Sequence, residues 1–107
     1  MPKFLIRAGY TAEGIRGLIK DKPSGRMAAV KKAVSGLGGK VESFYWALGD
    51  DDAILIVDMP DAESVAALTM TVAASGTSRS STTRLLTDKE VEAAIGKSVA
   101  YCPPGSK

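Results

Sequence analysis

The feature that most constrains the fold is a pair of apolar runs joined by a short acidic connection, in the segment FYWALGDDDAILIVDMPD at residues 44–61. The first run contains three consecutive aromatic residues, and the second is the unbroken Ala-Ile-Leu-Ile-Val of residues 53–57. Glycine and aspartate between two such runs are typical of a hairpin. We therefore predict two adjacent antiparallel strands, over residues 40–48 and 53–59.

The segment before this hairpin contains the signals of a strand followed by a helical crossover. Residues 3–9 alternate enough between apolar and polar to form a first strand. Thr11 can cap a short helical segment, which the Pro- and Gly-containing stretch DKPSG then ends. Ser24 can cap a second segment that ends at Gly38. We expect these two segments to form the first crossover.

The segment after the hairpin contains a second crossover and a last strand. Pro60 and Asp61 open a helix that Gly76 closes, and the polar residues 77–86 follow as a strand. Thr87 and Glu90 then have the spacing of a capping box, which predicts a short terminal helix. The order strand, helix, strand, strand, helix, strand predicts an α+β, ferredoxin-like βαββαβ fold with a four-stranded antiparallel sheet.

The apolar character of the two hairpin strands has a consequence for assembly. Nearly every position in them is apolar, which predicts that both faces of the sheet are buried there. The helices of the chain can cover one face, and a second copy is the simplest cover for the other. We therefore expect a homo-oligomer, a dimer or higher, built from a single domain at residues 1–97 with a tail at residues 98–107.

The composition excludes several classes of site. The chain of 107 residues has no histidine and one cysteine, Cys102, so zinc sets, haem ligation and Ser-His or Cys-His nucleophile pairs are not expected. We predict no metal and no cofactor, and we assign no role to Cys102. A formal charge of +2 and the lack of a long apolar run indicate neither nucleic acid nor membrane as a partner, and a cytoplasmic location is expected.

The three carboxylates of the hairpin connection are candidates for a site or for a turn. Successive residues of an extended chain point in opposite directions, so Asp50, Asp51 and Asp52 do not converge on one ion. Aspartate is favoured in turns because its side chain accepts bonds from nearby backbone N–H groups. We predict a structural turn at Gly49, Asp50 and Asp52, in which Asp52 fastens the start of the next strand. The alternative is that Asp50 or Asp52 acts as a base at a pocket mouth.

The second candidate stretch is TSRSSTTR, a predicted strand that is polar on both faces. Its odd spacing sends Arg79 and Arg84 to opposite faces, so one can line a pocket rich in hydroxyls while the other pairs with a carboxylate such as Asp52 or Glu42. Arg7 and Tyr10, near the end of the first strand, complete the candidate ligand-binding set. The alternative is a solvated edge strand, which its charges protect from aggregation.

Four segments together resemble the GYD-domain family of small, largely uncharacterised proteins: YTAEGIRGLIKD, GLGGKVESFYWALGDDDAILIVDMPD, SGTSRSSTTR and LTDKE. The resemblance covers residues 3 to 95 and implies a fold of the dimeric α/β barrel type, in which two sheets pack face to face and enclose a pocket. Arg79 and Arg84 match positions of the family pattern. Asp51 stands where the family has tyrosine, and Asp52 matches the carboxylate of the signature.

Three function classes stay open at this stage, and whether the protein is an enzyme stays open with them. The favoured one is an oligomeric module that binds a small anionic ligand or a protein partner at the interface between sheets. Arginine and hydroxyl groups of the polar strand are then the expected ligand contacts, because arginine binds carboxylates and phosphates bidentately. The alternatives are a cofactor-independent oxygenase or isomerase and a small-molecule sensing regulatory domain.

Overall fold

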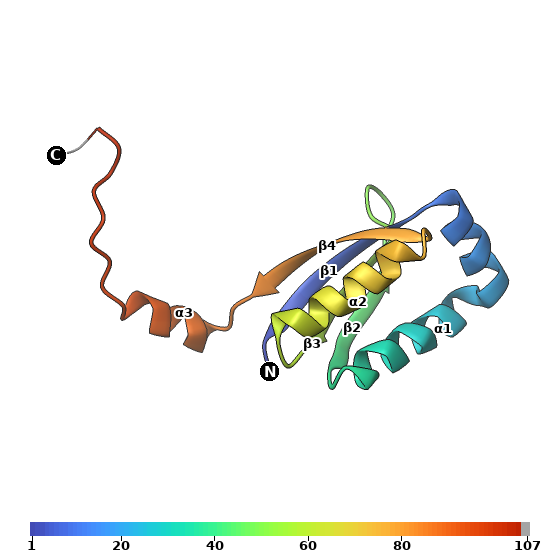
Figure 1. Ribbon diagram of the computed structural model, residues 1–107, viewed down its shortest axis with the longest axis horizontal. Coiled ribbons are helices and arrows are strands. Elements are labelled where there is room, and N and C mark those ends of the chain that lie inside the picture. Colours follow the sequence, from blue (N-terminus) through green and yellow to red (C-terminus); the bar gives the residue numbers. More distant parts are fainter. Residues whose placement is uncertain (106–107) are drawn as a thin grey trace.

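The computed structural model describes residues 1–105, which form a four-stranded sheet, two helices on one of its faces and a third helix that projects from the end of the last strand (Figure 1). In chain order the elements are β1 (Lys3–Tyr10), α1 (Ala12–Gly36), β2 (Lys40–Trp46), β3 (Ala53–Asp58), α2 (Ala62–Ala74), β4 (Ser78–Leu85) and α3 (Asp88–Ile95). Residues 106 and 107, the end of the predicted tail, lie outside the described residues.

The strands are arranged in the order β2-β3-β1-β4, and every neighbouring pair is antiparallel. The βαββαβ order and this sheet confirm the predicted ferredoxin-like α+β fold. Both central strands, β1 and β3, come from segments that alternate in burial, with Phe4, Ile6, Leu55 and Val57 facing the helices.

The hydrophobic core lies between this inner face of the sheet and the helices. Val34 of α1 and Val57 of β3 are completely buried, and Val65 of α2 is nearly so. Met59, also completely buried, follows β3 and packs in the same cluster. Side chains from both helices and both central strands thus share one core.

The outer face of the sheet is not covered by any element of the described chain. Leu5, Ile54 and Ile56 are half-buried on this face, and Tyr45 is 71% exposed. We call this surface the open face. A single chain therefore buries only one face of the hairpin, and the homo-oligomer stays a prediction.

Helix α1 consists of two segments, as the sequence predicts. Lys22 has φ 69° and ψ 154°, which interrupts the helix, and Pro23 follows at the first position of the second segment, where proline is favoured. The predicted cap at Ser24 is therefore wrong, because Ser24 lies inside the second segment. The predicted cap at Thr11 is confirmed: its hydroxyl accepts a hydrogen bond from the Gly14 N–H, at 3.1 Å.

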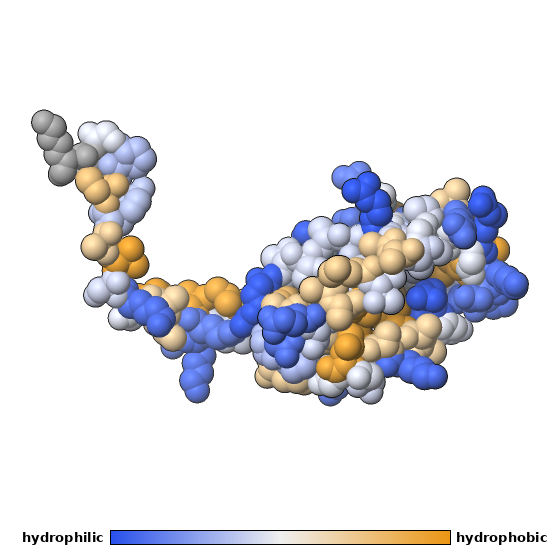
Figure 2. All heavy atoms as spheres, viewed as in Figure 1, coloured by the Kyte–Doolittle hydropathy of each residue, from blue (hydrophilic) through white to orange (hydrophobic). Residues whose placement is uncertain are grey.

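Helix α3 and the residues after it extend away from the sheet, and the longest dimension of the molecule is 60 Å (Figure 1). The predicted capping box is present, because Thr87 and Glu90 each accept a hydrogen bond from the other's backbone N–H. Val91 and Ile95 of α3 are exposed, and Figure 2 shows apolar surface along this projection. Within residues 1–105, no helix combines the length and apolar character needed to cross a membrane.

Candidate functional site

The acidic turn is fastened to the end of β1 through Asp52. The Tyr10 N–H donates to Asp52 Oδ2 at 2.8 Å, and the Asp52 N–H donates to the Ala8 carbonyl oxygen at 2.8 Å. The Ala47 N–H donates to the Asp52 carbonyl oxygen at 2.9 Å, which closes the turn. Asp52 therefore joins the start of β3 to β1 and to the end of β2, a structural use for this carboxylate.

Beside this turn, the open face carries a polar hollow that we call the Arg7–Arg79 hollow. Arg7 is paired with Ser81 across β1 and β4, and Gly9 is paired with Arg79. These positions share one face of the sheet because side chains alternate along a strand. Gly9 has no side chain, which leaves room beside the Arg79 guanidinium. The remaining rim comes from Tyr10, Thr11, Asp50, Asp51 and Ser80.

The two guanidinium groups of the hollow differ in their partners. Arg7 Nε lies 3.9 Å from Asp51 Oδ2, at the limit of an ion pair, and both side chains are partly exposed. Arg79 is exposed, and among residues 1–105 it has no hydrogen-bond or ion-pair partner. Partly exposed pairs contribute at most about 1 kcal/mol, so Asp51 can be displaced from Arg7 by a competing anion.

Tyr10 borders the hollow only where β1 ends, because its ring lies on the helix side of the sheet. The ring stacks on Trp46, with centroids 6.3 Å apart and planes at 27°. Burial raises the pKa of the Tyr10 hydroxyl, and the positive charge of nearby Arg26 opposes this by a smaller amount. The predicted grouping of the Tyr10 hydroxyl with Arg7 is therefore wrong, because the two side chains lie on opposite faces of the sheet.

Arg84 lies on the helix side near the other end of β4, away from the hollow. Its Nη2 is 2.7 Å from Glu90 Oε2, its Nη1 donates to the Leu85 carbonyl oxygen, and its guanidinium lies 5.7 Å from the centre of the Phe4 ring. Together with the Thr87 N–H, Arg84 lowers the pKa of Glu90 to about 2. Arg84 thus anchors α3 to β4 and does not meet Arg7 and Arg79. The predicted pairing with Asp52 or Glu42 is wrong, because Asp52 accepts from the Tyr10 N–H and Glu42 pairs with Lys3.

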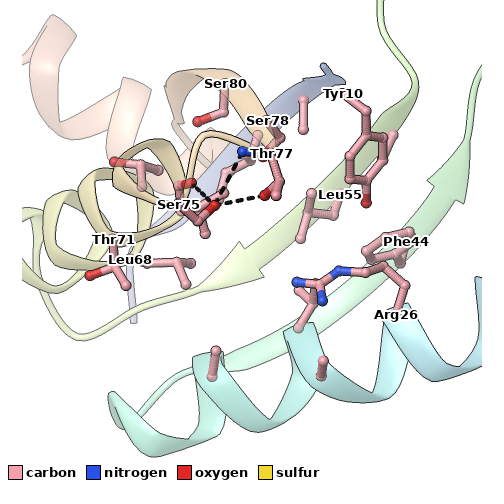
Figure 3. A pocket seen from close by; sticks show the side chains of 18 residues that line it. Tyr10, Arg26, Phe44, Leu55, Leu68, Thr71, Ser75, Thr77, Ser78 and Ser80 are labelled. Atoms are coloured by element: carbon pink, nitrogen blue, oxygen red, sulfur yellow. Dashed lines mark hydrogen bonds between the residues drawn. The ribbon is translucent and has the colours of Figure 1, made fainter. Parts of the chain in front are cut away.

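A second hollow, on the helix side, was not found from the sequence. It is a cavity between α1, α2 and the inner face of the sheet, and Arg26 of α1 projects into it (Figure 3). The sequence does hold a signal for it. Arg26 precedes Val30 by four residues and Val34 by eight, so a charge occupies the apolar stripe of the helix.

No three His, Cys, Asp or Glu side chains of the described residues are grouped so that they could hold a metal ion. The donors that the two hollows do offer are guanidinium groups and hydroxyls, which bind anions.

Comparison with known families gives one match. The family model described as the GYD domain matches residues 4–95, which confirms the resemblance seen in the sequence. Neither the curated proteins nor the solved structures contain a match to this chain.

Proposed function

The chain belongs to the GYD domain family, and we propose that it acts as a homo-oligomeric module that binds a small polar anion at the Arg7–Arg79 hollow, beside the interface between two sheets. The observation that carries this proposal is the exposed guanidinium of Arg79, which has no partner among residues 1–105 and lies next to an uncovered sheet face.

The open face supports association through the sheet. Leu5, Ile54 and Ile56 come from the two central strands, where Leu5 pairs directly with Ile56, and Tyr45 pairs with Ile54 from the neighbouring strand. These side chains form a continuous apolar surface, and burial of apolar area contributes roughly 25 cal/mol per Å². A second copy related by two-fold symmetry would place the same surface opposite itself.

The position of the hollow links the anion to this interface. Arg7 is paired with Ile54 on one side and with Ser81 on the other, so the polar hollow begins where the apolar surface ends. An anion there would bind to Arg79 and displace Asp51 from Arg7. The hydroxyl of Ser81 is a further donor at the rim, whereas the Thr11 hydroxyl already donates to the Gly76 carbonyl oxygen at 2.9 Å.

Light scattering tests the oligomer. At micromolar concentration we expect a mass of at least twice the 11.1 kDa of one chain. Ile56→Asp places a charge on the open face and should give a monomer. Met70→Asp, at an exposed apolar position of α2, is the matched control and should leave the mass unchanged. A wild-type monomer at this concentration would rule out the oligomeric module.

Isothermal titration with phosphate, small dicarboxylates and nucleotides tests the anion site. Arg79→Gln should weaken binding about 10- to 100-fold, because a hydrogen bond to a charged group contributes roughly 1.5–3 kcal/mol. Arg84→Gln removes a guanidinium from the same strand on the opposite face, so this variant should bind as the wild type does. Equal affinities of wild type and Arg79→Gln would exclude the hollow as the site.

A further inference from the structure

The cavity on the helix side has a volume of about 260 Å³ and lies between the two helices and the inner face of the sheet (Figure 3). Its floor is apolar and comes from Ile6 and Ala8 of β1 and Leu55 of β3. We call it the interhelical cavity. It lies on the opposite side of the sheet from the Arg7–Arg79 hollow.

The cavity exists because several side chains on the facing sides of the two helices are too small to fill the space between them. Helix α1 contributes Ala29 and Ala33 to the wall, together with Val30. Leu68 and Val72 of α2 form the facing wall. The walls and floor are thus mainly aliphatic, and aliphatic surface favours an apolar group over water.

One end of the cavity is polar. The guanidinium of Arg26 projects from α1 into the cavity, and the Tyr10 hydroxyl is directed toward α1 (Figure 3). Arg26 is half-buried, and no carboxylate of residues 1–105 lies within ion-pair distance of it. A partly buried charge without a counterion is costly. An anion in the cavity would offset this cost.

Ser78 supplies a second polar group without a partner. Its residue is 5% exposed, and its hydroxyl makes no hydrogen bond with any of the described residues. Since no fully buried side-chain N or O atom of these residues lacks a partner, the Ser78 hydroxyl keeps some contact with solvent. It lines the cavity and is paired with Tyr10 across β1 and β4, so the two hydroxyl-bearing residues are neighbours. In contrast, the Ser75 and Thr77 hydroxyls at the same end bond to each other at 2.7 Å.

We propose that the interhelical cavity binds a small monocarboxylate with an apolar body, such as an arylalkanoate, whose carboxylate contacts Arg26, Tyr10 and Ser78. The apolar body then lies on Ile6 and Leu55. The Tyr10 phenol is protonated at neutral pH, and burial raises its pKa further, so this side chain can donate a hydrogen bond to the carboxylate. The proposal concerns a different face and does not depend on the anion site at Arg79.

Charge and volume both restrict the ligand. One guanidinium matches one carboxylate, and the two hydroxyls add two donors, which is too few for a phosphate group with its larger charge. The cavity is somewhat smaller than the roughly 300–1,000 Å³ of sites for drug-sized ligands. A single aromatic ring with a short acid chain fits this size, and a long acyl chain does not.

Isothermal titration with phenylacetate is the test, with phenylacetamide as the uncharged control ligand. We expect the acid to bind the wild type and the amide to bind at least 10-fold more weakly. Arg26→Gln should weaken the acid about 10- to 100-fold, as expected for one charge-assisted hydrogen bond, and should leave the amide unchanged. Arg26→Lys should restore part of the affinity.

Two further variants separate the cavity from the open face. Ala29→Leu adds bulk to the cavity wall without changing its charge, and it should weaken both ligands. Arg79→Gln should bind phenylacetate as the wild type does, which distinguishes this site from the proposed anion site. Circular dichroism of each variant shows whether the fold is intact.

Several results would overturn the proposal. The first is that the wild type binds phenylacetate and phenylacetamide equally well. The second is that folded Arg26→Gln binds phenylacetate as tightly as the wild type does. The third is that the wild type binds neither phenylacetate nor phenylpropionate at millimolar concentration. A structure of the oligomer in which a segment of a second copy fills the cavity would also overturn it.

Discussion

Replacing Asp52 with alanine tests the physical account of the acidic turn. Three hydrogen bonds involve this residue, but two of them use its backbone N–H and carbonyl and survive the substitution. The bond that disappears is the one from the Tyr10 N–H to Asp52 Oδ2, at 2.8 Å in a half-buried position. The substitution therefore isolates a single contact between a carboxylate and a backbone amide.

The expected cost follows from that contact. A hydrogen bond to a charged group contributes roughly 1.5–3 kcal/mol, and partial exposure extends this range downward to about 1 kcal/mol. The Tyr10 N–H that loses its acceptor lies at the end of β1 and can reach water in part. We therefore expect Asp52→Ala to lower the free energy of unfolding by about 1–3 kcal/mol. Asp52→Asn keeps a neutral acceptor and should lose about half as much.

Urea unfolding followed by circular dichroism measures this change, with Asp50→Ala as the control. Asp50 is exposed and makes no hydrogen bond or ion pair within residues 1–105, so its variant should stay within about 0.5 kcal/mol of the wild type. If Asp52→Ala and Asp50→Ala have the same stability, Asp52 does not fasten the turn and the argument from its geometry fails.

Two further predictions concern helix packing and pH. Gly14→Ala should lower the free energy of unfolding by about 1–3 kcal/mol in urea melts, because the added Cβ would lie 1.9 Å from the Thr77 carbonyl oxygen. A Cβ added at Gly17 of the same helix would have no atom within 4 Å, so Gly17→Ala should be neutral or stabilising. If Gly17→Ala lowers the free energy of unfolding as much as Gly14→Ala does, the steric explanation is wrong. Because the pKa of Glu90 is lowered, its stabilisation of α3 is fully present above pH 4.5 and is lost as the pH falls toward about 2. The NMR chemical shifts of α3 should report this loss. In Arg84→Gln the Glu90 pKa should rise toward 4.5, and an unchanged titration would show that Arg84 does not cause the shift.

The elements with strong local signals were predictable from the sequence. The hairpin follows from two apolar runs around an acidic connection, and the caps at Thr11 and Thr87 follow from residue types that accept backbone N–H bonds. The helix interruption was predicted near DKPSG but its position was not. Pro23 favours the first turn of a helix, and this places the break at Lys22 instead of a cap at Ser24.

The grouping of site residues was less predictable, because it depends on which strands are neighbours. Alternation separates Arg79 from Arg84, but only the pairing of β4 with β1 shows that Arg79 lies beside Gly9 and that Arg84 lies beside Phe4. The Arg84–Glu90 pair depends on the path of the chain between β4 and α3. The interhelical cavity depends on the distance between two helices, which no local pattern encodes, although the charge of Arg26 on an apolar stripe marks its wall.

The polar sequence of β4 is compatible with both of its predicted roles, a solvated edge strand and a strand that lines a ligand pocket. Within residues 1–105 it is an edge strand that pairs with β1 alone, so charged and hydroxyl side chains protect its free edge from pairing with other chains. The same residues face two different hollows, because Arg79 lies on the open face while Ser78 lies on the helix side. An apolar β4 would remove Arg79 from one hollow and Ser78 from the other. Protection of the edge and the proposed ligand binding therefore require the same composition, and only substitutions at single positions of β4, such as Arg79→Gln, separate the two roles.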